Sequence, residues 1–374
     1  MGRPKYKVDD WVEVLGIDEI LATLDGDGCL DGMPFMPEMT QFCGQRFQVY
    51  KSAHKGCDTV FPVRSRRFDD AVHLRTRCDG HGHAGCQARC LLYWKTAWLK
   101  RVNGPAPAPP PNSAAVGAHA RPTSAPKEAR MDLARLLEST IARYEQGVPV
   151  FRCQATQLPY AGREVKWWDV RQYLADYLSG NVGLRTIFRG AVFAAFQTTV
   201  NLVPGVGRPM RWLYNSFRWL WRGAKYPRST GTIPVGAPTP TACLNLQPGE
   251  TVRVKSHDEI LKTVSVASKN RGMWWDAECV PYCGGTYRVL ARVDKIIEEK
   301  HGRMVEMKNP CIILEGVVCK GRYSDYRMFC PRELYPYWRE IWLERVEPAD
   351  LDGGAPACAG TSQERPVASS ATAR

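Results

Sequence analysis

Thirteen residues, CDGHGHAGCQARC from Cys78 to Cys90, hold three cysteines and two histidines. Thiolate sulfur and imidazole nitrogen are the ligands that zinc prefers in proteins, and a structural zinc site takes four of them. The candidate ligands in this part of the chain are Cys43, His54, Cys57, Cys78, His83, Cys86 and Cys90. The sequence therefore predicts a metal site here, with zinc as the expected ion and iron or an iron–sulfur cluster as the alternative.

One segment of the chain occurs twice. VEVLGIDEILATL, which begins at Val12, matches VRVKSHDEILKTV, which begins at Val252. YWKTAWLKRV from Tyr93 matches YWREIWLERV from Tyr337, in the same order along the chain. Chance does not produce two ordered matches of this length, so they indicate a duplication.

The second copy carries cysteines of its own, which extend the metal hypothesis to it. Aligning the copies pairs Cys43 with Cys283, Cys78 with Cys319 and Cys90 with Cys330. These shared positions leave the fourth ligand open: Cys86, Cys57, His83 or His54 in the first copy, and Cys311 or Cys279 in the second. The alternative is that the shared cysteines are small buried hydrophobic side chains.

Alternating apolar and polar residues predict short strands in each copy, as in ETVRVKS and TYRVLARV. Several short strands in fewer than about 100 residues are typical of a small barrel. We therefore predict an α+β protein in which two copies of a small SH3-like β-barrel flank a basic α-helical middle segment. The predicted boundaries are 10–102 for the first barrel, 103–130 for a Pro/Ala-rich linker, 131–225 for the helical segment, 226–247 for a Pro/Thr-rich linker, 248–346 for the second barrel and 347–374 for a disordered tail.

The motifs shared by the copies are DEIL followed by Thr two positions on, CG before an aromatic residue and Val, and YW(K/R)..WL.RV. With the cysteines between them, these motifs resemble those of uncharacterised bacterial proteins with a tandem SH3-like, cysteine-bearing domain. The resemblance covers both copies. It implies the architecture and no activity.

Both copies also keep two tryptophans four residues apart, Trp94 and Trp98 in the first and Trp338 and Trp342 in the second. Such tryptophans most often close a small core. The alternative is an aromatic groove that binds a peptide, as SH3 domains use.

The middle segment is strongly basic, since residues 182–228 contain eight arginines and lysines and no acidic residue. Within it, RPMRWLYNSFRWLWRGAK predicts a basic amphipathic helix. Its expected partner-binding residues are Arg211, Arg218, Arg222 and Lys225, flanked by Trp212 and Trp219. Tryptophans beside a basic stripe are typical of helices that lie in a membrane interface. The alternatives are that the stripe is a solvated surface or that it binds nucleic acid.

The whole chain carries a net charge of +13, which favours anionic partners. It shows no export signal and no run of about 18 apolar residues, so we expect a cytoplasmic protein that can associate peripherally with a membrane. No nucleophile elbow, Walker loop or HExxH motif is present, and the sequence does not decide whether the protein is an enzyme. The sequence favours a metal-stabilised adaptor that binds an acidic protein or an anionic membrane surface. The alternatives are an iron-dependent enzyme or electron carrier using the first copy, and a nucleic-acid-binding protein.

Overall fold

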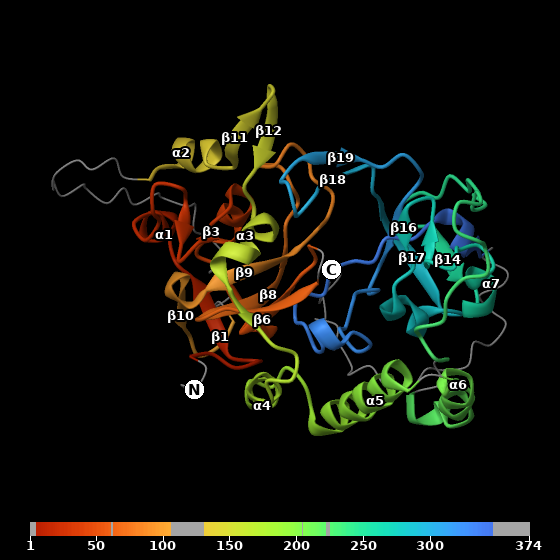
Figure 1. Cartoon of the computed structure of the whole chain (residues 1–374). Coiled ribbons are helices and arrows are strands. Elements are labelled where there is room, and N and C mark those ends of the chain that lie inside the picture. Colours follow the sequence, from red (N-terminus) through yellow and green to blue (C-terminus); the bar gives the residue numbers. More distant parts are fainter. Residues whose placement is uncertain (1–4, 61–62, 106–130, 204, 222–224, 347–374) are drawn as a thin grey trace, which may run out of the picture.

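The two copies of the repeat lie at opposite ends of the computed structural model (Figure 1). The structure describes residues 5–60, 63–105, 131–203, 205–221 and 225–346. The predicted tail and most of the first predicted linker lie outside these ranges. Each copy is built around a small antiparallel sheet, ordered β10-β1-β4 in the first and β20-β17-β14-β21 in the second.

The elements of the first copy are β1 Trp11–Val14, α1 Ile17–Leu21, β2 Cys29–Leu30, β3 Met33–Pro34, η1 Pro37–Phe42, β4 Arg46–Gln48, β5 Lys51–Ser52, β6 Lys55–Asp58, β7 Arg64–Arg67, β8 Ala71–Arg77, β9 Leu91–Lys95, η2 Thr96–Trp98 and β10 Leu99–Arg101. Those of the second copy are β14 Thr251–Val254, α7 His257–Leu261, β15 Lys269–Asn270, β16 Met273–Trp274, η4 Ala277–Tyr282, β17 Thr286–Arg292, β18 Lys295–Ile297, β19 Met304–Glu306, β20 Ile312–Leu314, η5 Asp325–Arg327, η6 Glu340–Trp342 and β21 Leu343–Arg345.

Both copies use the same strand register. Val14 lies opposite Leu99, and the matching Val254 lies opposite Leu343. In each of the two central strands the valines alternate with partly or fully exposed residues, as expected of a strand with one face on a core. The duplicated sequence therefore produces the same sheet twice.

The kept tryptophans lie in the two cores. Trp94, Trp98, Trp338 and Trp342 have no exposed surface. The indole Nε1 of Trp98 donates to Thr23 Oγ1 at 3.0 Å, and that of Trp342 donates to Thr263 Oγ1 at 2.9 Å. Because these rings are enclosed, they favour the core interpretation over a peptide-binding groove.

The predicted SH3-like barrel is wrong. Over the described ranges, the protein has mixed α and β structure with many small antiparallel sheets and no closed barrel. A barrel closes only when the two edge strands of its sheet pair with each other. Here the sheet of the first copy ends at β4 and β10, while strands β5 to β9 form two separate sheets. The strands are two to seven residues long.

The middle segment contains strands as well as helices. Its elements are α2 Leu133–Glu138, β11 Ile141–Glu145, β12 Val148–Phe151, α3 Gln154–Ala161, β13 Arg163–Val165, α4 Arg171–Leu178, α5 Leu184–Leu202, α6 Gly207–Ser216 and η3 Arg218–Trp221. Leu136 and Leu158 join the core of the first copy, and β13 pairs with β7. The side-chain amide of the buried Gln154 accepts the N–H of Tyr93 and donates to its C=O, both at 2.8 Å. These bonds pair the backbone groups of Tyr93 at the edge of β9. Helices α4, α5 and α6 then run from the first copy to the second (Figure 1).

The predicted Pro/Thr-rich linker at 226–247 packs against the second copy. Leu246 is fully buried in its core. The Glu340 carboxylate accepts the backbone N–H groups of Leu244, Asn245 and Leu246 at 2.6 to 3.0 Å. Because these contacts use backbone atoms, residue composition alone did not indicate them.

Candidate functional site

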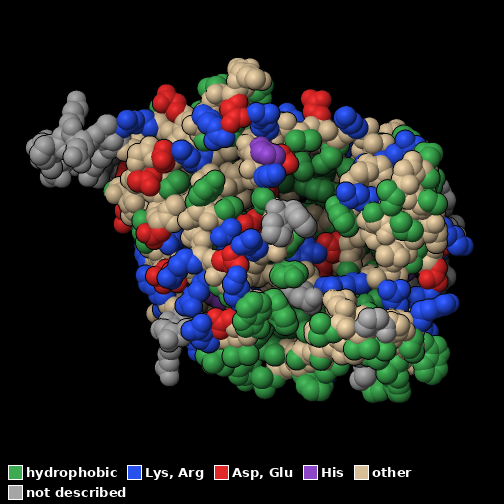
Figure 2. All heavy atoms as spheres, in the orientation of Figure 1, with side chains coloured by type: hydrophobic (Ala, Val, Ile, Leu, Met, Phe, Trp, Pro, Cys, Tyr) green, Lys and Arg blue, Asp and Glu red, His purple; other side chains and the backbone are tan. Residues whose placement is uncertain are grey.

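An exposed apolar surface covers the outer side of the middle helices. It consists of Leu184, Phe188, Val192, Leu202, Trp212, Leu213, Phe217 and Trp219, and we call it the apolar face. Figure 2 shows a broad band of hydrophobic side chains along the lower edge of the molecule, where α5 and α6 lie. The side chains of Phe188, Trp212 and Trp219 are each 70% exposed. A contiguous exposed patch of this kind marks an interaction surface.

The inner side of the same helices explains this orientation. Phe193 on α5 and Tyr214 on α6 are buried together with Tyr226 and Tyr323 in a small aromatic cluster. Their rings meet edge to face, with 5.2 Å between the centroids of Phe193 and Tyr323. This packing faces the protein, while the side chains of the apolar face stay exposed.

The predicted basic stripe does not form one surface. Arg211 lies over the Tyr226 ring, 5.4 Å from its centroid, and Lys225 pairs with Asp258. Arg218 is exposed, and Arg222 lies outside the described residues. The exposed cations beside the apolar face are instead Arg185, Arg208 and Arg218. Sequence periodicity missed this because it assumed one continuous helix, whereas α6 ends at Ser216.

A cavity of about 140 Å³ adjoins the start of α5. Its wall includes Lys51 from the first copy, Lys320 and Arg322 from the second, and Cys330. The two lysines share one carboxylate, since Glu333 Oε1 lies 2.7 Å from Lys51 Nζ and 2.8 Å from Lys320 Nζ. This ion cluster joins the two copies at the cavity.

Acid titration tests the strength of the Glu333 cluster. Burial alone would raise the pKa of the Glu333 carboxyl, but Lys51 and Lys320 lower it to about 2. A carboxyl with a lowered pKa stabilises the fold when the pH is above 4.5, the usual pKa of a glutamate. That contribution is lost as the pH falls toward 2. We expect Glu333→Gln to lower the free energy of unfolding at pH 7 by on the order of 2 kcal/mol.

The difference in stability between Glu333→Gln and the unmodified protein should shrink as the pH falls from 4.5 to 2. Thermal melts across this pH range measure that difference. Glu344→Gln is the matched control, because the Glu344 carboxylate lies in an exposed pair with Arg253. A difference for Glu333→Gln that stays constant over the whole pH range would contradict the assignment.

The CDGHGHAGCQARC segment forms a loop held by Glu38. Glu38 Oε1 accepts the N–H of Gly82 at 3.1 Å and lies 2.7 Å from His83 Nδ1. Burial opposes ionisation of Glu38, but the His83 hydrogen bond leaves the pKa of its carboxyl below the usual value. His83 Nε2 lies 2.9 Å from the backbone oxygen of Arg152. With Glu38 at one ring nitrogen and Arg152 at the other, the His83 ring ties the loop to the middle segment.

The second copy repeats part of this arrangement. Glu278 Oε1 accepts the N–H of Tyr323 at 2.6 Å. Gly82 and Tyr323 each lie four residues after a shared cysteine, Cys78 and Cys319 respectively. This agreement supports the pairing of Cys78 with Cys319.

The pairing of Cys90 with Cys330 is not supported. The N–H of Cys78 donates to the oxygen of Cys90, whereas that of Cys319 donates to the oxygen of Leu334. Leu334 precedes Tyr337 by the same three residues that separate Cys90 from Tyr93. Cys330 therefore belongs to an insertion of the second copy.

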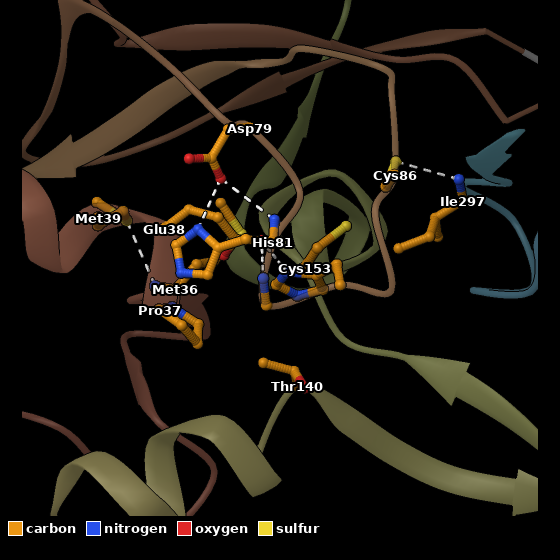
Figure 3. Close-up of polar contacts among 12 residues, drawn as sticks. Met36, Pro37, Glu38, Met39, Asp79, His81, Cys86, Thr140, Cys153 and Ile297 are labelled. Carbon is orange, nitrogen blue, oxygen red and sulfur yellow. Dashed lines mark hydrogen bonds and ion pairs between the residues drawn. The ribbon is translucent and has the colours of Figure 1, made fainter. Parts of the chain in front are cut away.

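The loop from Cys78 to Cys90 contacts the second copy. Cys86 Sγ accepts the N–H of Ile297 at 3.3 Å, the contact at the right of Figure 3. Gln87 Oε1 accepts the N–H groups of Asp294 and Lys295 at 2.6 and 3.0 Å, and the Gln87 N–H donates to the Lys295 oxygen. This loop thus pairs with the chain at the start of β18.

The remaining predicted ligands do not gather at one site, although two of them are in contact. Cys43 and Cys283 are half-buried against the two separate cores, and burial raises their pKa. His54 Nε2 lies 3.3 Å from Asp176, and Cys311 Sγ accepts from Arg339 at 3.5 Å. Cys57 of the first copy contacts Cys330 of the second.

Within the described ranges, no three His, Cys, Asp or Glu side chains form a group that could hold a metal ion. Zinc remains a prediction from the sequence, which elemental analysis of the purified protein tests. The absorption spectrum of the same sample tests the iron alternative.

Comparison with protein-family models, curated proteins and solved structures finds no match. The resemblance based on the shared motifs therefore stays a prediction. None of the helices within the described ranges is both long and apolar enough to cross a membrane.

Proposed function

We propose that this protein is an accessory protein that docks on an anionic lipid surface through the apolar face of α5, α6 and η3. The observation that carries the proposal is the exposure of Phe188, Trp212 and Trp219 beside a cationic rim. Interfacial helices insert large apolar and tryptophan side chains into the boundary between headgroups and acyl chains. Their flanking cations are attracted to anionic headgroups.

The combination of cations and exposed apolar side chains favours a lipid surface over nucleic acid. The segment 182–228 has eight basic residues and no acidic one, so an anionic surface meets no repulsion from it. A nucleic acid would use the cations and leave the exposed aromatic side chains in water unless its bases were unstacked. A lipid surface takes up both the cations and the apolar side chains.

Vesicle co-sedimentation tests this proposal. We expect the full chain to bind vesicles of phosphatidylcholine with phosphatidylglycerol and to bind pure phosphatidylcholine much more weakly. Higher salt should weaken the binding because it screens the exposed cations. Trp212→Ser with Trp219→Ser should reduce partitioning at least about tenfold, because the apolar contribution is lost.

Trp274→Ser is the matched control, since Trp274 is 63% exposed on the second copy, away from the apolar face. Its binding should equal that of the unmodified protein. Equal loss in the control and in the Trp212/Trp219 variant would argue against the apolar face. Binding to duplex DNA without binding to vesicles would overturn the proposal in favour of nucleic acid.

A further inference from the structure

Two buried cysteines from different copies of the repeat lie in contact. Cys57 belongs to β6 of the first copy, and Cys330 follows η5 in the second. The backbone N–H of Cys57 donates to Cys330 Sγ at 3.1 Å. Each residue is at most 5% exposed. The fold thus brings together two thiols that lie more than 270 residues apart in the chain.

A buried guanidinium accompanies this pair. Arg332 is 3% exposed, donates to the Cys57 oxygen at 2.6 Å and pairs with Glu299 at 2.8 Å. The positive charge of Arg332 therefore lies beside the cysteine pair.

The cavity beside α5 adjoins Cys330 of this pair. Cys330 and Pro331 form part of its wall, together with Lys51, Lys320 and Arg322. Its volume of about 140 Å³ accommodates a molecule of the size of a hydroperoxide. The neighbouring cations stabilise negative charge that develops on an oxygen leaving group.

We propose that Cys57 and Cys330 are a redox-active pair that a hydroperoxide oxidises to a disulfide joining the two copies. The Cys330 thiolate attacks the terminal peroxide oxygen, so that an S–O bond forms, the O–O bond breaks and the alkoxide or hydroxide leaves with the electron pair. The product on Cys330 is a sulfenic acid. The Cys57 sulfur then displaces its hydroxyl group, which leaves as water with the proton from the Cys57 thiol. A dithiol reductant restores both thiols.

The sulfur contacts of two other cysteines differ from those of this pair. Cys86 Sγ accepts the N–H of Ile297, and Cys311 Sγ accepts from Arg339. Cys243 is exposed and therefore serves as the internal control for unselective oxidation.

Peptide mapping of the full chain after treatment with stoichiometric hydrogen peroxide tests the pair. We expect a product that has lost two hydrogen atoms and yields a disulfide-linked peptide containing Cys57 and Cys330. Cys57→Ser should leave Cys330 as a sulfenic acid that dimedone labels, and Cys330→Ser should abolish the linked peptide. Cys243→Ser should give the same linked peptide as the unmodified protein.

The unmodified protein decides the outcome even if a variant fails to fold. Alkylation after oxidation would overturn the proposal if Cys57 and Cys330 both remain free thiols while Cys243 is already oxidised. A linked peptide that pairs either cysteine with a different partner would also overturn it. Vesicle binding does not enter this readout, so the outcome is independent of the proposed lipid docking.

Discussion

Replacing Lys55 with methionine is expected to destabilise the folded protein by about 3–5 kcal/mol, because it leaves a buried carboxylate without its cation. Lys55 Nζ lies 2.5 Å from Asp176 Oδ2 and donates to the Met328 oxygen at 2.8 Å. The Lys55 and Asp176 side chains are 2% and 0% exposed. The ammonium group also lies over the Tyr173 ring, 5.0 Å from its centroid.

Because this ion pair lies where three parts of the protein meet, its loss should destabilise the whole fold. Lys55 lies on β6 of the first copy, Asp176 on α4 of the middle segment and Met328 in the second copy. One ammonium group therefore holds all three parts. Urea denaturation followed by tryptophan fluorescence measures the loss, since both cores contain enclosed indole rings.

Two comparisons separate the ion pair from simple packing. Lys55→Met combined with Asp176→Leu should recover most of the lost stability, because it removes both charges together. Lys100→Met removes an exposed lysine of the first copy that pairs with Glu13, and should cost less than about 1 kcal/mol. A loss for Lys55→Met as small as that for Lys100→Met would refute this role of the buried pair.

Features that depend on short stretches of sequence could be predicted. The duplication follows from matching letters, and the two copies share the register of Val14 with Leu99 and of Val254 with Leu343. The enclosure of Trp98 and Trp342 follows from their size and their repeated spacing. The sequence also placed Trp212 and Trp219 beside a basic stripe as partner-binding residues, and both side chains are exposed.

Features that depend on contacts between distant residues could not be predicted. Gln154, from the middle segment, hydrogen-bonds the backbone of Tyr93 at the edge of β9. Lys55 forms its ion pair with Asp176, which lies 121 residues further along the chain. The Cys90–Cys330 alignment was wrong because it matched residue types, whereas the backbone hydrogen bonds align Cys90 with Leu334. Sequence spacing also gave no reason to pair Cys57 with Cys330, because they belong to different copies.

The loop from Cys78 to Cys90 illustrates this difference. Its histidines and cysteines suggested metal chemistry when only the sequence was considered. In the structure, His83 bonds to Glu38 and Arg152, and Cys86 bonds to the backbone of Ile297. Polar side chains in a short run can thus serve to join the parts of a protein.

Trp98→Ala is expected to lower the free energy of unfolding by about 3–5 kcal/mol, since it removes a large fully buried side chain. Trp98 lies edge to face with Phe35, with 5.3 Å between ring centroids, and Trp342 lies in the same way with Trp275 at 5.1 Å. The equivalent Trp342→Ala should therefore cost a similar amount. Urea denaturation of both variants measures the two losses.

The hydrogen bond of Trp98 can be separated from its packing. Thr23→Val keeps the volume near the indole but removes the Oγ1 acceptor, and should cost about 1–2 kcal/mol. Trp98→Phe should fall between Thr23→Val and Trp98→Ala, because it retains an aromatic ring and leaves a smaller cavity. If Trp98→Ala costs no more than Thr23→Val, the indole contributes through its hydrogen bond alone. That result would contradict the assignment of Trp98 to the core of the first copy.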